Sequence, residues 1–276
     1  MRLLREHPMS ANDFTARFGP WALVAGASEG LGLAYAEALA QRGMHLLLLA
    51  RRGDALEQVA TRLRAEYRIE VATVVVDLAA PDLATQLPNY LSDRDIGLLV
   101  YDAARTHIAP FETADLAHHL GIVDVNCRGP LTLCHALIPA LRARGRGGIV
   151  LMSSMSSLQG SGLIASYAAS KAFNSVLAES LWEELRTDGV AVMACLAGAI
   201  DTPSYRHNTP EHKQKRAMPM APAAVAEDTL RALAAGRGPL FIPGRMNRLV
   251  AAIMRCFGSR ARTRFFSRMT RDLYGG

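Results

Sequence analysis

A tyrosine and a lysine stand four residues apart at Tyr167 and Lys171, and Ser154 lies thirteen residues upstream of the tyrosine. On a helix this spacing places the phenol and the ammonium on one face, one turn apart. A free phenol has a pKa near ~10, so about one in a thousand is ionised at pH 7. A nearby cation lowers that pKa, which would let the tyrosine exchange a proton with a carbonyl or an alcohol. The alternative is an accidental spacing on a solvated helix face.

Lysine is rare in this chain. Of the 31 lysines and arginines, only Lys171, Lys213 and Lys215 are lysines. Positive charge is therefore supplied almost everywhere by arginine. Lysine carries a compact charge on a flexible stem, whereas arginine carries a planar guanidinium group. The use of lysine at position 171 therefore favours a specific role for that side chain.

Short apolar runs alternate with helical patterns along most of the chain. The runs predict buried strands at about 21–26, 44–50, 71–77, 97–101, 148–153, 190–196 and 240–242. The helical patterns span about 31–42, 54–67, 81–92, 113–142, 166–187 and 222–235. This alternation predicts an α/β fold, a Rossmann-type doubly wound parallel sheet of about seven strands with helices on both faces.

A glycine-rich turn follows the first predicted strand and leads into a helix. It contains Gly26, Gly30 and Gly32. Glycines let the backbone turn tightly and let a pyrophosphate approach, and the helix N-terminus supplies amide donors. The spacing differs from the GxGxxG fingerprint, so the prediction depends on the strand before it and the helix after it. The alternative is a glycine-rich turn that binds nothing.

Charged residues follow the second and third predicted strands. An acidic residue after the second strand binds the adenosine ribose in NAD-selective folds, whereas an arginine suits a 2′-phosphate. Arg51 and Arg52 therefore predict NADP(H), the alternative being two solvated charges. Asp77 could meet the adenine edge or cap the next helix.

These motifs, in this order, resemble the short-chain dehydrogenase/reductase family over about residues 18–245. Residues 18–52 are also similar to the branch that contains 3-oxoacyl-CoA reductases and 17β-hydroxysteroid dehydrogenases. The resemblance rests on the three turn glycines, Asp77 with Leu78, Asn126, Ser154, Tyr167, Lys171, and Gly198 with Thr202.

The resemblance implies an NADP(H)-dependent oxidoreductase that interconverts a carbonyl and a secondary alcohol. The implied substrate is a lipophilic small molecule, such as a 3-oxoacyl thioester or a steroid-like ketone. Tyr167 would act as general acid or base, and Lys171 would lower its pKa and hold the nicotinamide ribose. Ser154 would bind the substrate oxygen, and Asn126 would position a relay water. The implied cofactor contacts are Gly26, Ser28, Glu29, Gly30, Leu31, Gly32, Arg51, Arg52, Asp77, Leu78, Ala103, Ala104, Tyr167, Lys171, Gly198, Ile200 and Thr202.

The sequence departs from the family's pattern after three strands. Ala25 replaces the usual threonine, and Ala197 replaces the usual proline. Residues 101–104, Tyr-Asp-Ala-Ala, stand where the family usually has Asn-Asn-Ala-Gly, and a Cβ at Ala104 could crowd the cofactor. The alternative function is therefore a cofactor-binding regulatory or scaffold protein on the same fold with little catalysis.

The charge of the chain is concentrated at one end. The net charge is +6, but residues 245–276 hold eight arginines and one aspartate, so the remaining residues sum to −1. Apolar residues at helical spacing predict a basic amphipathic helical tail there. Such a tail could contact an anionic membrane, or pack on its own domain or on another subunit. No nucleic-acid-binding motif accompanies the charge, so nucleic acid is not a predicted partner.

The domain organisation follows from these patterns. We expect an N-terminal extension (1–17), a single Rossmann-type domain (18–244) and the tail (245–276). Residues 203–220 contain three prolines and little periodicity, which predicts a mobile lid loop that could include a short helix. No signal peptide or membrane-spanning run is evident, and the four cysteines form no metal-ligand cluster, which together favour a cytoplasmic protein with reduced thiols and no bound metal.

The two longest helical patterns, 113–142 and 166–187, are long enough to pair with copies of themselves. In the family that the chain resembles, these helices often build a dimer. The sequence therefore predicts a homodimer or a homotetramer. His118, His119 and His135 fall within the helical patterns and are predicted to be surface or interface residues.

Overall fold

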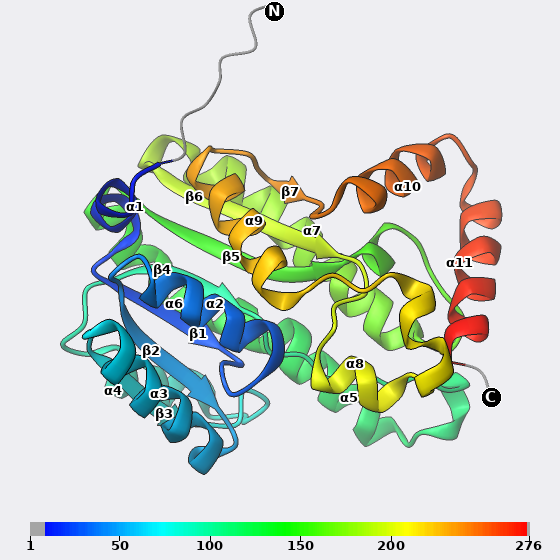
Figure 1. Cartoon of the computed structure of the whole chain (residues 1–276), viewed down its shortest axis with the longest axis horizontal. Coiled ribbons are helices and arrows are strands. Elements are labelled where there is room, and N and C mark those ends of the chain that lie inside the picture. Colours follow the sequence, from blue (N-terminus) through cyan, green and yellow to red (C-terminus); the bar gives the residue numbers. More distant parts are fainter. Residues whose placement is uncertain (1–8, 275–276) are drawn as a thin grey trace, which may run out of the picture.

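Seven parallel strands form one sheet in the order β3-β2-β1-β4-β5-β6-β7, and helices cover both of its faces (Figure 1). The computed structural model describes residues 9–274. Its strands are β1 (Trp21–Ala25), β2 (His45–Ala50), β3 (Val71–Val75), β4 (Ile96–Tyr101), β5 (Gly147–Ser154), β6 (Val190–Ala197) and β7 (Leu240–Phe241). Each strand coincides with an apolar run in the sequence, so the predicted doubly wound α/β fold is confirmed.

Alternate residues of the central strands enter two separate cores, one on each face of the sheet. In β1, Ala22 and Val24 belong to the first core, whereas Leu23 and Ala25 belong to the second, as the two-residue period of a strand requires. The first core is covered by α1 (Ala11–Phe18), α2 (Gly30–Ala40), α3 (Gly53–Tyr67) and α9 (Pro222–Ala234). The second is covered by α4 (Leu83–Leu91), α6 (Gly129–Arg144) and α7 (Ala165–Leu185).

The helix predicted over 113–142 is interrupted in the structure. It begins as α5 (Leu116–Val123), where the Asp115 side chain accepts a hydrogen bond from the His118 amide at 2.8 Å. A π-helical turn, Asp124–Arg128, then joins α5 to α6. Such turns insert one residue into the helical register and are frequent at functional sites. Asn126 lies in this turn.

Residues 203–220, the lid segment, hold the short helix that the sequence allows and a second helical stretch. They contain α8 (Pro203–Asn208) and a 3₁₀ helix, Glu211–Ala217. The Thr202 hydroxyl caps α8 by accepting from the Tyr205 amide at 3.2 Å. The buried Tyr205 hydroxyl donates to the Gln214 carbonyl at 2.7 Å, which ties the two helices together.

The N-terminal boundary of the domain lies earlier than the sequence suggests. Phe14 and Phe18 of α1 are buried in the first core. Residues 11–17, assigned from the sequence to an N-terminal extension, therefore pack with the domain.

The basic tail forms α10 (Arg245–Arg255) and α11 (Ser259–Tyr274). Both helices face the domain with small side chains, since Ala251, Ser267 and Thr270 are buried. Six of their large apolar side chains are exposed: Met246, Leu249, Ile253, Phe257, Phe265 and Met269. Much of the apolar surface of the tail thus faces away from the chain's own domain, although Val250, Met254 and Phe266 are partly buried.

No helix within residues 9–274 is long and apolar enough to cross a membrane. All four cysteines are free thiols. Over the same residues, the structure contains no group of three or more His, Cys, Asp or Glu side chains that could hold a metal ion.

Candidate active site

Most of the candidate residues gather at the carboxyl edge of the sheet. The glycine turn follows β1, residues 102–104 follow β4, Ser154 ends β5, and residues 198–202 follow β6. The strand order reverses between β1 and β4, and ligands of open α/β sheets bind outside the carboxyl ends of the strands at such a switch point. Tyr167 and Lys171 reach the same edge from the first turns of α7.

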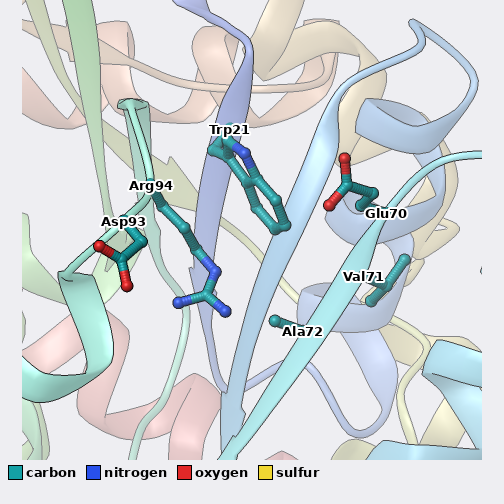
Figure 2. Close-up of a pocket in the computed structure, with 6 residues that line it drawn as sticks. All are labelled: Trp21, Glu70, Val71, Ala72, Asp93 and Arg94. Carbon is teal, nitrogen blue, oxygen red and sulfur yellow. The ribbon is translucent and has the colours of Figure 1, made fainter.

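A surface hollow at the opposite edge of the sheet is a separate feature (Figure 2). It is lined by Trp21, Glu70, Val71, Ala72, Asp93 and Arg94. The Arg94 guanidinium lies 5.3 Å from the centroid of the Trp21 ring. The hollow lies where β1 and β3 begin and contains none of the candidate residues, so we do not assign it to the site.

The glycine turn has no room for larger residues. Gly26 and Gly30 adopt left-handed backbone angles, with φ of +95° and +60°. A Cβ on Gly32 would lie 2.1 Å from the Gly26 carbonyl oxygen. No side chain caps the N-terminus of α2, which begins at Gly30. The turn is therefore a backbone cradle at a helix N-terminus, the arrangement that binds phosphate groups.

The two arginines after β2 have different surroundings. Arg52 forms an ion pair with Glu29 at 2.9 Å and donates to the Ser28 hydroxyl at 3.1 Å, so it braces the glycine turn. Arg51 is exposed, and no hydrogen bond or ion pair joins its guanidinium to another described residue. Arg51 is thus the one of the pair that is available to a ligand.

Asp77 forms a local turn after β3. Its carboxylate accepts a hydrogen bond from the Ala79 amide at 3.0 Å. The residue at the N-cap of α4 is Asp82, so the alternative that Asp77 caps this helix was wrong. Leu78 is buried beside it, whereas Asp77 is exposed at the outer end of the site.

The unusual segment after β4 packs directly on the glycine turn. The amides of Asp102 and Ala103 both donate to the Ala25 carbonyl at 2.9 Å. Ala104 is exposed at this edge. Burial raises the pKa of the Asp102 carboxyl to about 6, although Lys171 and a hydrogen bond from the Gly32 amide oppose the rise. Asp102 therefore places an ionisable carboxyl at a position where the family usually has a neutral asparagine.

Tyr167 is less acidic in this structure than its spacing to Lys171 predicts. Burial raises the pKa of Tyr167 to about 12, and a hydrogen bond with Ser154 lowers it only in part. The Lys171 ammonium lies 5.6 Å from the centroid of the tyrosine ring and donates to the Met152 carbonyl at 2.8 Å. The prediction of a lowered tyrosine pKa is therefore wrong for this structure, because burial dominates the shift.

Lys171 is a buried ammonium, with 3% of its surface exposed. Burial lowers its pKa to about 8, while the Asp102 carboxylate acts in the opposite direction. Asp102, Lys171 and Tyr167 thus form one electrostatic cluster at the centre of the site.

Serine hydroxyls fix α7 against β5. The Ser153 hydroxyl donates to the Lys171 carbonyl at 2.8 Å and lies 2.8 Å from the Ser175 hydroxyl. Ser175 in turn donates to Ser157 at 3.1 Å. Of this serine cluster, Ser154 is the member that hydrogen-bonds the Tyr167 phenol.

Asn126 uses its whole carboxamide inside the protein. Its Oδ1 accepts from the Arg105 amide at 2.8 Å, and its Nδ2 donates to the Arg105 carbonyl at 2.9 Å and to the Ser170 hydroxyl at 2.8 Å. The side chain is fully buried. Asn126 therefore holds the segment after β4 against α7.

The segment after β6 is anchored on both sides. Ile200 pairs with Met220, and the Asp201 amide donates to the Met220 carbonyl at 2.9 Å. The Thr202 methyl lies 3.3 Å from the position of a Cβ on Gly30, so Thr202 contacts the glycine turn. A Cβ on Gly198 would lie 2.9 Å from the Asn247 side chain of α10, so this glycine lies under the tail.

Two further residues, His119 and Tyr274, are not among the predicted site residues. His119 is buried rather than on the surface, and its ring nitrogens lie 2.8 Å from the Phe111 carbonyl and the Ser166 hydroxyl. Tyr274, in the last turn of α11, is close enough to raise the pKa of Tyr167. No local signal in the sequence marks either residue, because both reach the site through tertiary contacts.

The chain is similar to known proteins over most of its length. The family model described as short chain dehydrogenase matches residues 20–213. A 7β-hydroxysteroid dehydrogenase of Clostridium sardiniense is 32% identical over 236 residues, which cover 86% of this chain and 90% of that protein. A very-long-chain 3-oxoacyl-CoA reductase of Mus musculus is 30% identical over 190 residues, which cover 67% of this chain and 61% of that protein.

Solved structures agree with these matches. A 7β-hydroxysteroid dehydrogenase studied for its stereoselectivity superposes with a TM-score of 0.85 at 25% identity, covering 92% of this chain and 98% of that one. A short-chain dehydrogenase from Sphingobium yanoikuyae, solved in complex with NADPH, gives a TM-score of 0.74 at 27% identity, covering 86% and 95% of the two chains.

Proposed function

Because the chain belongs to the short-chain dehydrogenase family, we propose that it is an NADP(H)-dependent oxidoreductase that interconverts a ketone and a secondary alcohol. The observation that carries this proposal is the cluster of Ser154, Tyr167 and Lys171 beside the glycine turn. A proton donor and a phosphate cradle thus lie at the same edge of the sheet.

The chain's own residues fit a nicotinamide dinucleotide. The backbone cradle at residues 26–32 has no room for a Cβ at Gly32 and leaves the N-terminus of α2 uncapped, which suits a pyrophosphate. The unpaired guanidinium of Arg51 suits a 2′-phosphate. Lys171 and Tyr167 would hold the nicotinamide ribose, and Ile200 with Thr202 the carboxamide end. When bound, the cofactor supplies or accepts the hydride.

Tyr167 would move the proton. With a pKa of about 12 it keeps its proton at neutral pH, which is the form that a general acid needs in ketone reduction. Ser154 would donate a second hydrogen bond to the same substrate oxygen. The Lys171 ammonium would stabilise the phenolate that forms, since an opposite charge nearby favours the ionised form. Asn126 would support the site by fixing the backbone of Arg105, in the segment after β4, through two hydrogen bonds.

The substrate that we propose is lipophilic. Two of the similar proteins are named for steroid and long-chain acyl substrates. A suitable panel therefore contains steroid ketones, 3-oxoacyl thioesters and small cyclic ketones. NADPH binding without turnover of any of them would instead support a regulatory or scaffold protein that binds the cofactor.

Arg51 provides the test of cofactor choice. We expect the chain to prefer NADPH to NADH, and Arg51→Ala to raise the KM for NADPH by about tenfold or more by removing a charge-assisted phosphate contact. In the same variant the KM for NADH should stay within twofold of the value for the parent chain, and a twofold change corresponds to about 0.4 kcal/mol. Steady-state kinetics with both cofactors measure this. Equal use of NADH and NADPH by the parent chain would contradict the NADP(H) assignment.

We propose a homodimer or homotetramer as the state of assembly. The helices predicted to pair expose large apolar side chains: Leu116, Leu120, Val123, Leu131, Phe173 and Val176. These lie on α5, α6 and α7. Exposed apolar groups of this kind mark interaction surfaces, and sedimentation velocity would give the number of copies.

Contact of the tail with an anionic membrane is a separate proposal. Arginines alternate with the exposed apolar residues of α10 and α11, a pattern typical of helices that lie on lipid. We expect the chain to sediment with vesicles of phosphatidylglycerol and phosphatidylcholine but not with phosphatidylcholine alone. The quadruple substitution Leu249→Glu, Ile253→Glu, Phe265→Glu and Met269→Glu should abolish binding, whereas equal sedimentation of this variant would rule out the tail as the contact.

A further inference from the structure

Tyr167 lies in a helix start that has no side-chain cap. The helix α7 begins at Ala165, so Tyr167 is the third residue of its first turn, and Ile164 at the N-cap supplies no side-chain hydrogen bond. The residue before the N-cap, Leu163, has a left-handed backbone with a φ of +67°, which costs energy for a residue other than glycine. Uncapped amides and this strain favour fraying of the first turn unless contacts from other elements hold it.

One such contact comes from a buried histidine of α5. The Nδ1 atom of His119 lies 2.8 Å from the Ser166 hydroxyl, and its Nε2 atom lies 2.8 Å from the Phe111 carbonyl oxygen. His119 is 8% exposed, and its ring stacks on the Phe111 ring with 4.2 Å between the centroids. Because Ser166 directly precedes Tyr167, His119 links the segment after β4 and α5 to the turn that carries the phenol.

The two hydrogen bonds determine the tautomer of His119. A carbonyl oxygen can only accept, so Nε2 carries a proton and donates it to the Phe111 carbonyl. In the neutral imidazole the Nδ1 atom is then an acceptor, and the Ser166 hydroxyl donates to it. Both ring nitrogens are used inside the protein. His119 therefore has no donor or acceptor left for a substrate, and any effect on the reaction passes through α7.

A second pair of contacts holds the same face of α7 one turn further along. Ser170 follows Ser166 by four residues, so the two hydroxyls share a face of the helix. Asn126 donates to the Ser170 hydroxyl at 2.8 Å, and this hydroxyl donates to the Tyr167 carbonyl at 2.8 Å. The backbone of Tyr167 is thus held on its C-terminal side by the Asn126 turn and on its N-terminal side by His119.

We propose that His119 is a positioning residue for the proton transfer, because its bond to Ser166 holds the first turn of α7 where the Tyr167 phenol reaches the substrate oxygen. This inference rests on the proposed oxidoreductase function. A displacement of about 1 Å in a reacting group can lower a rate by about 10²-fold. The bond should act on kcat, since the glycine turn and Arg51, which would bind the cofactor, follow β1 and β2 instead.

Substitutions at both ends of the bond test this role. His119→Gln keeps a donor for the Phe111 carbonyl but places no acceptor beside Ser166, and Ser166→Ala removes the hydroxyl itself. Each should lower kcat for ketone reduction by about tenfold or more, while the KM for NADPH changes less than about threefold. The two substitutions together should lower kcat no further than either alone, because both break the same bond.

A conservative variant and a control complete the set. His119→Asn has a side-chain oxygen that can replace Nδ1 as the acceptor for Ser166, so its kcat should stay within about threefold of that of the parent chain. Ser92→Ala removes an exposed hydroxyl at the end of α4 and should match the parent chain. Equal losses of kcat in His119→Asn and His119→Gln, or additive losses in the double variant, would overturn the role of the bond to Ser166.

Hydrogen exchange gives a readout that does not need turnover. The Ala168 amide donates to the Ile164 carbonyl at 2.8 Å within the first turn of α7. If this turn frays without the bond to His119, the Ala168 amide should exchange about tenfold faster in His119→Gln and Ser166→Ala than in His119→Asn or Ser92→Ala. Mass spectrometry of peptides that cover residues 164–171 measures the rate.

The kinetic and exchange measurements separate this inference from the proposed function. Faster exchange in a chain that reduces no ketone would support His119 as the residue that holds the first turn of α7, and it would contradict the oxidoreductase function. Unchanged kcat in both His119→Gln and Ser166→Ala would overturn the positioning role, whatever the exchange rate, and would leave the oxidoreductase function intact.

Discussion

Replacing Tyr167 with phenylalanine should lower kcat for ketone reduction by about 10³-fold, because a positioned general acid contributes typically 10²–10⁴. Phenylalanine keeps the ring and the shape of the first turns of α7 but removes the only proton that Tyr167 can give. Ser154 would remain as a hydrogen-bond donor to the substrate oxygen, but it would not carry the developing charge as Lys171 and the phenolate do together. Rapid-kinetic and steady-state assays of NADPH oxidation with the preferred ketone measure the loss.

Cofactor binding separates this effect from damage to the site. The Kd for NADPH should change less than about threefold in Tyr167→Phe, since the cradle and Arg51 are intact, and threefold is about 0.65 kcal/mol. The midpoint of thermal unfolding should stay close to that of the parent chain. A variant that binds NADPH normally and retains full turnover would contradict the role of Tyr167 as general acid.

Asp102→Asn should increase stability at pH 7.5 by up to about 3 kcal/mol, because one pKa unit corresponds to about 1.36 kcal/mol. The fold raises the pKa of Asp102 from 3.8 to about 6. Below the unfolded pKa, the carboxyl is neutral in both states and costs nothing. As pH rises through the folded pKa, the unfolded chain ionises more readily than the folded one, so the free energy of unfolding decreases. Asparagine does not ionise, so this loss of stability is removed, and its side-chain oxygen can still accept a hydrogen bond from the Gly32 amide.

Urea denaturation of the parent chain and of Asp102→Asn at pH 4 and pH 7.5 checks the sign of this change in stability. The two should differ little at pH 4, and the variant should be the more stable at pH 7.5. Asp93→Asn is the control, because it replaces an exposed carboxylate in the same way. In this variant the free energy of unfolding should change between pH 4 and pH 7.5 as much as it does in the parent chain. A variant that is less stable at pH 7.5 would show that the charge of Asp102 is needed, for example to hold the Lys171 ammonium.

Local patterns in the sequence were sufficient to predict the sheet and the glycine turn. Each strand coincides with a short apolar run, and the glycines at 26, 30 and 32 are required by close contacts or by a positive φ. The pairing of Tyr167 with Lys171 follows from helical spacing alone. These features depend on residues that are near one another along the chain, so they can be predicted without knowledge of tertiary contacts.

The properties that could not be predicted depend on distant residues. The spacing of Tyr167 and Lys171 indicates a lowered tyrosine pKa, but burial by elements far along the chain reverses the sign. The tail is a clearer case. In this amphipathic segment Phe265 is 43% exposed, whereas the polar Ser267 is 7% exposed. The helix is oriented by hydroxyl hydrogen bonds, which hydrophobic patterning does not detect.

The position of α11 also bears on how such a chain can diverge. The part that the family model recognises ends at residue 213, and α11 begins at Ser259. The residues that we propose for proton transfer thus lie in the matched part, whereas α11, which hydrogen-bonds the loop before Tyr167, lies beyond its end. Substitutions confined to this sixteen-residue helix would therefore leave every residue of the proposed proton transfer unchanged.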